Sequence, residues 1–243
     1  MLVAWEAMAL VALSFLALMT AGTGLAGYGL AGTVAAELVC IVAPTAAFLA
    51  ARRVPPAELG LGRVSLLGVA GGLVFGAAAF YLVAVGEHAW LERILPTPPA
   101  VERSLERMIV PAQGARALVV DLAGVALVPA LAEELLFRGV VFGALRPRLG
   151  AVGAVVGSAV AFALYHGSIY RLIPALVGGL FLGGVRAGSR SLWPALAFHF
   201  ANNVVVVVAL RAGWSAPPPA LVPFGVAALT AVAGAALVVR SRP

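Results

Sequence analysis

Long apolar runs recur along the whole chain and constrain its fold more than any other feature. Several are about 18 residues or longer, which is enough for a helix to cross the hydrocarbon core of a bilayer. Of the 243 residues, 63% are hydrophobic and only 11% are charged, whereas soluble domains have about 25% charged residues. A chain with so little water-facing surface is predicted to be an integral membrane protein, with membrane lipid as its main surroundings.

The apolar runs divide the chain into about eight membrane segments. We therefore predict an all-α fold, a polytopic membrane helix bundle, made of one integral membrane domain over residues 1–243. The expected segments are residues 5–22, 33–51, 65–86, 115–145, 151–166, 172–187, 192–210 and 220–239. The first run has no positively charged residues ahead of it and carries Glu6, so we interpret it as a membrane helix rather than a cleaved signal peptide.

Arginines follow every second segment and predict the orientation of the chain. They come after segments two, four, six and eight: Arg52, Arg53, Arg63, Arg146, Arg148, Arg186, Arg190, Arg240 and Arg242. The positive-inside rule places these loops, and with them both termini, in the cytoplasm. The net charge of +6 is scattered between apolar runs rather than gathered in a stripe, so nucleic acid is not expected as a partner.

Several shorter patterns predict local structure. Residues 57–63 are expected to form a short turn, and residues 101–109 have the pattern of a helix lying in the membrane interface or of an ordinary exposed connector. Glycines spaced four residues apart predict close helix packing: Gly68/Gly72/Gly76, Gly153/Gly157, Gly179/Gly183 and Gly184/Gly188. Cys40 is the single cysteine and is interpreted as a small apolar core residue.

Segment four carries charges that are costly to place in lipid. A charge at the bilayer centre costs about 2.5–3.5 kcal/mol on insertion scales. Glu134 and Arg138 lie four residues apart with the carboxylate first, which is the favourable order for an intrahelical ion pair. We interpret this pair as supporting structure. Glu133 lies about 100° around the helix and has Phe137 four positions later, so it is free to meet another helix.

Two histidines on other segments are the expected partners of Glu133. His166 ends segment five, and His199 lies in segment seven with Asn203 four residues later on the same helical face. Glu133 with His166 can hold and deprotonate a water molecule, while His199 with Asn203 can donate hydrogen bonds to an oxyanion. This combination suits the hydrolysis of a peptide bond by water, at a site expected to open toward the cytoplasmic side.

Other residues near these positions are assigned simpler roles. Phe137, Phe162 and Tyr165 are expected to form the walls of the substrate pocket. Asn202 is adjacent to Asn203 but faces about 100° away from it, so it is interpreted as a helix-packing residue.

The three polar clusters together resemble a known family. The stretches EELLFR at 133–138, FALYH at 162–166 and HFANN at 199–203 are similar to the EExxxR, FxxxH and HxxxN/B motifs of the CPBP intramembrane proteases. That family includes the CAAX prenyl endopeptidases and the bacterial Abi and bacteriocin-processing proteins. The resemblance covers about half the chain, with a motif core of roughly residues 113–211.

The resemblance implies a mechanism and a class of substrate. It implies a glutamate protease in which Glu133 and His166 carry the catalytic water, His199 and Asn203 form the oxyanion hole, and Glu134 and Arg138 support them. The expected partner is a membrane-associated protein or peptide, with or without a prenyl or other lipid group. Arginine in place of lysine, with abundant Ala and Val, is typical of a GC-rich prokaryotic source, which predicts a prokaryotic cell membrane as the location.

Two other classes of function stay open. A membrane transporter or proton-coupled carrier could use the buried Glu, His and Arg groups, and would show flux without new peptide ends. A non-catalytic membrane scaffold of the same family is the other. The resemblance favours a site without a cofactor. Zinc is the alternative, because Glu133, His166 and His199 are the ligand types of some zinc peptidases.

Overall fold

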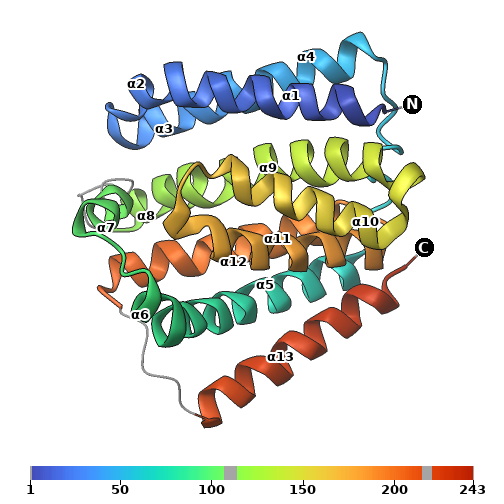
Figure 1. The fold of residues 1–243 in the computed structure, drawn as a ribbon. Helices are drawn as coiled ribbons and strands as arrows, with labels where there is room; N and C mark the ends of the chain where they lie inside the picture. Colours follow the sequence, from blue (N-terminus) through green and yellow to red (C-terminus); the bar gives the residue numbers. More distant parts are fainter. Residues whose placement is uncertain (1, 107–113, 215–220, 243) are drawn as a thin grey trace.

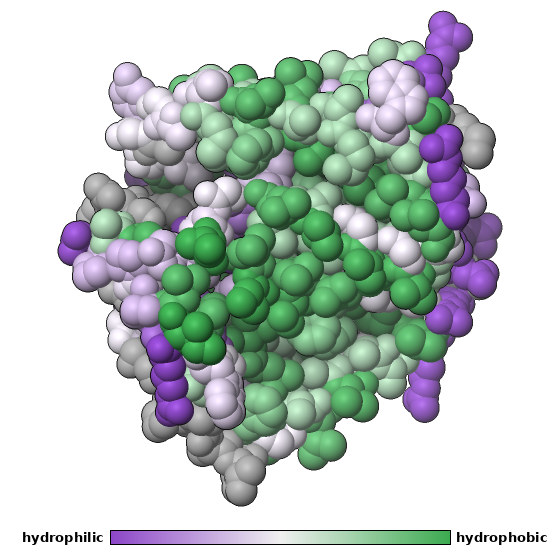
Figure 2. All heavy atoms as spheres, in the orientation of Figure 1, coloured by the Kyte–Doolittle hydropathy of each residue, from purple (hydrophilic) through white to green (hydrophobic). Residues whose placement is uncertain are grey.

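The protein is mostly helical in the part of the chain that the computed structural model describes, which is residues 2–106, 114–214 and 221–242. Within these residues, seven helical runs are long and apolar enough to cross a membrane. Their apolar side chains form a broad green band over the middle of the molecule, while hydrophilic groups gather at its two ends (Figure 2). The predicted all-α polytopic membrane bundle is confirmed.

Many helices contain short π-helical stretches, labelled η, that continue the flanking α-helices. The first half of the chain contains α1 (Ala4–Ala17), η1 (Leu18–Gly22), α2 (Thr23–Ala26), α3 (Gly29–Glu37), η2 (Leu38–Val42), α4 (Ala43–Ala51), α5 (Leu66–Gly86), η3 (Glu87–Leu91), α6 (Glu92–Ile94) and α7 (Pro99–Glu106). The second half contains α8 (Ala115–Asp121), η4 (Leu122–Leu127), α9 (Val128–Glu134), η5 (Leu135–Val141), α10 (Phe142–Tyr165), α11 (Ile169–Ser189), α12 (Trp193–Arg211) and α13 (Leu221–Arg240).

The count of about eight segments differs from the seven runs at one place. The predicted segments 115–145 and 151–166 belong to a single run, Ala115–Tyr165. At Gly150 the backbone leaves the helical region, with φ 68° and ψ −173°, a conformation that glycine adopts without steric cost. The chain turns back on itself there (Figure 1), so one continuous run makes both of the predicted passages.

The helices that carry the polar motifs lie in the middle of the bundle, with the other helices packed around them. In Figure 1, α1 and the helical run from α3 to α4 lie along the top, and α13 lies along the bottom. Between them, α9, α10, α11 and α12 form the middle of the bundle, and α5 packs against both α12 and α13. The middle of the bundle carries all of the polar motifs described above.

Glycines bring α5 unusually close to α12. A Cβ atom added to Gly72 would lie 2.3 Å from the carbonyl oxygen of Pro194, and one added to Gly76 would lie 2.1 Å from that of Phe198. Both distances are too short for real atoms, so only glycine fits. The packing role predicted for this ladder is confirmed. The contact at Gly76 also holds α12 in place at Phe198, the residue before His199.

The other ladders differ in their surroundings. Gly179 and Gly183 of α11 lie against Ala159 and Val155 of α10, as expected for close helix packing. A Cβ atom added to Gly184, by contrast, would meet no described atom of a neighbouring helix within 4 Å. The packing role predicted for Gly184 is therefore wrong, because its side of α11 faces open space.

Replacing Gly76 with alanine is expected to destabilise the bundle. The new methyl group would overlap the backbone of α12, and overpacking of this kind costs about 1–3 kcal/mol. The midpoint of thermal unfolding of the purified protein in detergent measures the effect. Gly86→Ala is the matched control in the same helix, because nothing lies within 4 Å of that position. Equal midpoints for the two variants would contradict the close approach of α5 and α12.

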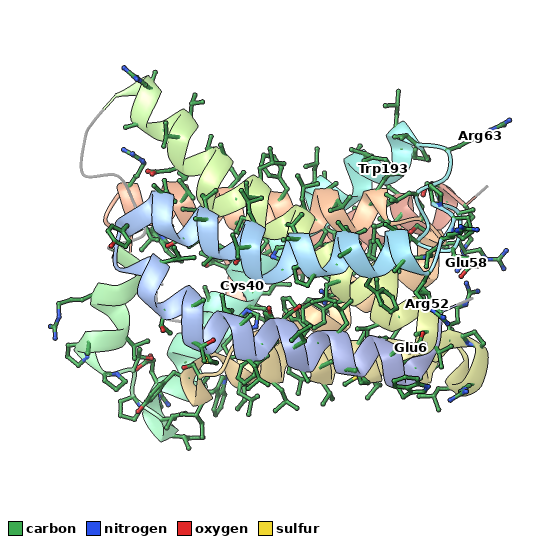
Figure 3. The ribbon with its side chains drawn as sticks, turned by 90° about the horizontal axis from the view of Figure 1, so that it is seen from above. Glu6, Cys40, Arg52, Glu58, Arg63 and Trp193 are labelled. Carbon is green, nitrogen blue, oxygen red and sulfur yellow. The ribbon has the colours of Figure 1, made fainter. Side chains whose placement is uncertain are left out.

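The predicted turn at residues 57–63 closes one end of the bundle. Leu59 is buried, and Gly60 has a φ of 78°. The carbonyl oxygen of Gly60 accepts a hydrogen bond from the backbone N–H of Leu192 at 2.9 Å, and the carbonyl of Gly62 accepts one from the indole N–H of Trp193 at 3.2 Å. Arg63 and Trp193 lie at the same end of the molecule in Figure 3.

The arginine-rich loops all lie at that closed end. The chain begins and ends there as well (Figure 1), and Glu6 forms an ion pair with Arg52 at 3.1 Å (Figure 3). Cys40 is buried in the bundle, as expected. The interfacial-helix interpretation of residues 101–109 depends partly on Met108 and Ile109, which lie outside the described residues, so it stays a prediction.

Candidate active site

The site contains an ion pair within the continuous helical run of α9 and η5. Glu134, the last residue of α9, accepts a hydrogen bond from Arg138 at 2.7 Å between Oε1 and Nη1. Both side chains are completely buried. The intrahelical pair predicted from the spacing is therefore present, and each charge has a partner that offsets the cost of its burial.

Arg138 connects its own helical run with α10 and α11. Its Nη2 donates to the carbonyl oxygen of Gly179 on α11 at 3.2 Å, and its guanidinium lies over the ring of Phe162 on α10, 4.4 Å from the ring centre. Because Gly179 has no side chain, α11 also lies close to Ala159 of α10 at this position. The guanidinium is thus held in one orientation, with its bond to Glu134 fixed.

His199 contacts both glutamates of the motif. Its Nδ1 lies 3.0 Å from Oε1 of Glu134, and its Nε2 lies 3.7 Å from Oε2 of Glu133. Glu134 therefore holds His199 as well as Arg138, a role that its predicted pairing with Arg138 did not include. A carboxylate that accepts from one ring nitrogen fixes the orientation of the ring, so the other nitrogen is directed at Glu133.

His166 lies directly after α10 and is oriented by its own helix. Its Nδ1 is 2.8 Å from the carbonyl oxygen of Phe162, a contact in which Nδ1–H donates and Nε2 remains available as an acceptor. The ring of Phe162 lies edge-to-face against His166 at 4.7 Å between centres and against His199 at 6.0 Å. Phe162 thus separates the two histidines.

A cavity of about 240 Å³ lies beside these groups. Both histidines line it, and most of the remaining lining is apolar, as is usual for small-molecule and peptide sites. The lining residues are Phe80, Val83, Ala84, Glu87, Phe162, His166, Arg171, Pro174, Ala175, Gly178, Leu182, Phe198, His199 and Asn202. Glu133 is not among them. It reaches the cavity through His199, with 14% of its side chain exposed.

Two of the predicted pocket residues lie behind the wall rather than in it. Phe162 lines the cavity. Phe137 packs against Phe162 and Tyr165, with 5.2 Å between the ring centres in each case, and it is fully buried. Phe137 of η5 and Tyr165 of α10 therefore pack behind Phe162, because their rings point toward α1 and toward each other.

The positions of the two asparagines relative to the cavity are the reverse of those expected from the sequence. Asn202, interpreted from the sequence as a packing residue, lines the cavity. Its Nδ2 donates to Oδ1 of Asn203 at 3.3 Å, so Asn203 contacts the cavity residue rather than the cavity itself. The two amides form one unit, three and four residues after His199.

One comparison with known proteins found a similarity. Residues 115–205 match the family model described as type II CAAX prenyl endopeptidase Rce1-like. The matched residues form an Rce1-like domain, and this part of the chain is similar to the type II CAAX prenyl endopeptidases. No curated protein and no solved structure matches the chain.

The Rce1-like domain contains all three polar motifs, and it runs from the start of α8 into α12. Glu133, Glu134 and Arg138 come from its first run, His166 from its turn after α10, and His199 from its last helix. The matched region lies within the motif core of roughly residues 113–211 expected from the sequence. Helix α5 is outside the matched residues, yet it supplies one wall of the cavity.

The cavity lies toward the end of the bundle opposite to the arginine-rich loops. Its lining includes the last turns of α5 up to Glu87, the first turns of α11 from Arg171, and His166 after α10. All of these lie away from the arginine-rich end, where the turn containing Leu59 and Gly60 packs over α12. The expected opening of the site toward the cytoplasmic side stays a prediction.

The sequence reasoning missed three charged residues of the site. Arg171 and Glu87 line the cavity next to the Rce1-like motifs. Glu37 of α3 lies close enough to Glu133 for their charges to interact, and its Oε2 is buried without a hydrogen-bond partner among the described residues. The signal was available, since each is a charged residue in or next to an apolar run, where charge commonly marks function.

Within the part of the chain that the structure describes, no three His, Cys, Asp or Glu side chains are grouped so that they could hold a metal ion. Glu133 and His199 lie together, but the orientation of His166 is set by a backbone carbonyl. The geometry of the Rce1-like site therefore lends no support to the zinc alternative.

Proposed function

We propose that the protein is an intramembrane endopeptidase that uses a glutamate-activated water molecule and no cofactor. The observation that carries the proposal is His199, which contacts both Glu134 and Glu133 at the edge of a mostly apolar cavity. A carboxylate next to an oriented histidine in such a cavity has the groups that water-mediated hydrolysis requires.

In the proposed reaction, Glu133 with His166 holds a water molecule and accepts one of its protons. The resulting hydroxide attacks the carbonyl carbon of the peptide bond. His199 and the Asn202–Asn203 pair donate hydrogen bonds to the oxyanion that forms. The proton held by Glu133 then passes to the leaving amine as the C–N bond breaks, and the carboxylate is restored.

The dimensions of the site favour a particular form of substrate. A cavity of about 240 Å³ between α5, α11 and α12 admits an extended chain segment but no folded domain. Because the middle of the molecule has an apolar outer surface (Figure 2), the proposed substrate is a membrane-associated protein or peptide. Attachment of a prenyl or other lipid group to it is compatible with the proposal and is not required by it.

The test compares new peptide termini in membranes that hold the wild-type protein with those in membranes that hold Glu133→Gln. We expect new termini only with the wild type, and the cleaved sequences identify the substrate. A chelator is expected to leave the wild-type pattern unchanged. Identical termini in both membranes, with both proteins folded, would reject the protease. Flux that depends on Glu133 would then favour the transporter alternative.

We further propose that the arginine-rich end faces the cytoplasm and that the cavity lies toward the other side. Arg148 is exposed at the arginine-rich end and Arg116 is exposed at the opposite end, while the native Cys40 is buried. In intact cells, a membrane-impermeant maleimide is expected to label Arg116→Cys, and to label Arg148→Cys only after permeabilisation. The reverse labelling pattern would invert the proposed orientation.

A further inference from the structure

A second cavity lies at the arginine-rich end, apart from the catalytic groups. It has a volume of about 350 Å³ and lies between the turn before α5, the bend within α10 and the end of α11. Its charged lining consists of Glu58 and three arginines, Arg146, Arg186 and Arg190. None of these residues belongs to the three motifs, and the proposed hydrolysis does not use them.

Arg186 is a fixed part of this cavity. Only 4% of the residue is exposed, and its Nε donates to the carbonyl oxygen of Arg138 at 3.3 Å. Its guanidinium lies 5.3 Å from the ring centre of Phe142 and against Gly60, where a Cβ atom would lie 2.6 Å from Cζ. The side chain therefore cannot move away to find another partner.

This fixed guanidinium is left incompletely bonded. Its Nη1 is buried and has no hydrogen-bond partner among the described residues, although burying an unsatisfied polar group is costly. The positive charge of Arg146 also acts on Arg186. Like charges that converge in a partly buried site are unfavourable unless an anion lies between them.

The remaining two arginines are available to such an anion. The guanidinium groups of Arg146 and Arg190 form no hydrogen bond or ion pair with the residues that the structure describes. Arg190 ends α11 in the left-handed region, at φ 58°, which few residues other than glycine and asparagine adopt readily. Helices often end with a residue in this conformation, and here it places Arg190 at the rim of the cavity.

We propose that this cavity binds a phosphate group, and specifically the phosphodiester of an anionic lipid headgroup. Arginine forks match the geometry of phosphate oxygens, and the three arginines outnumber the single carboxylate of Glu58. The cavity lies at the end of the membrane-spanning helices α10 and α11 (Figure 1), which is where headgroups are located. Basic pockets between membrane helices on the cytoplasmic side bind anionic lipids in the same way.

The test measures binding, so it does not depend on whether the protein is a protease. Purified protein in neutral detergent is titrated with phosphatidylglycerol, with phosphatidylcholine and with inorganic phosphate, and the thermal midpoint and bound lipid mass are recorded. We expect phosphatidylglycerol to bind the wild type. In Arg146→Gln and in Arg190→Gln, each of which lacks one arginine, its affinity should be about fivefold lower. Glu58→Gln is expected to raise the affinity, because it removes the competing carboxylate.

Arg148→Gln is the matched control, because this exposed arginine lies two residues from Arg146 and does not line the cavity. It is expected to bind phosphatidylglycerol as the wild type does. Equal losses in Arg148→Gln and Arg146→Gln would overturn the site in favour of diffuse charge attraction. Inorganic phosphate binding as tightly as the lipid would keep the phosphate site but overturn the lipid assignment. No preference for phosphatidylglycerol over phosphatidylcholine, without phosphate binding, would overturn both.

Discussion

Peptide cleavage by Glu133→Gln is expected to be slower than wild-type cleavage by about a thousandfold, because removal of a general base typically costs 10² to 10⁴ in rate. Glutamine has nearly the shape of glutamate but cannot accept the proton of the attacking water. His199 keeps its hydrogen bond to Glu134 in this variant, so the fold around the site should be preserved. The rate constant on a cleaved peptide, identified from the new termini, is the measurement.

The control for this experiment replaces a glutamate outside the site. Glu6→Gln removes the ion pair with the half-exposed Arg52 at the arginine-rich end, away from the site. It is expected to cleave at the wild-type rate. A Glu133→Gln enzyme that retains more than about a tenth of wild-type activity would contradict the role of this carboxylate as the base.

Replacing Arg138 with methionine is expected to cause the largest loss of stability. The change leaves the completely buried carboxylate of Glu134 without its main partner and removes the hydrogen bond to Gly179 and the contact with Phe162. Removing one partner of a buried ion pair costs about 3–5 kcal/mol. We expect a low yield of folded protein and a lower thermal midpoint in detergent.

The double variant Glu134→Gln with Arg138→Met separates lost pairing from lost volume. Because neither charge then remains buried alone, part of the stability should return. Activity should not return, because His199 loses the carboxylate that orients it. A double variant as unstable as Arg138→Met would show that the arginine acts mainly through its contacts with α10 and α11 rather than through the ion pair.

Most of the fold followed from properties that are local in sequence. The lengths of the apolar runs predicted the membrane helices, and the i, i+4 spacing of Glu134 and Arg138 predicted an ion pair that the structure contains. The division of the run Ala115–Tyr165 into two passages also followed from the sequence, because Arg146 and Arg148 interrupt the apolar pattern shortly before the bend at Gly150. The backbone conformation of that glycine then showed where the chain turns back.

The sequence by itself determined an all-α membrane bundle and placed the three motifs of an Rce1-like domain on three of its helices. The tertiary structure decided which groups meet. It placed His199 against both glutamates, and Asn202 and Arg171 in the cavity wall. It also placed the turn that contains Gly60 against Leu192, which closes the arginine-rich end of the bundle. These outcomes depend on the rotation and depth of each helix relative to its neighbours. Contacts between distant residues, such as Gly76 against Phe198, set that rotation and depth, and no local pattern encodes them.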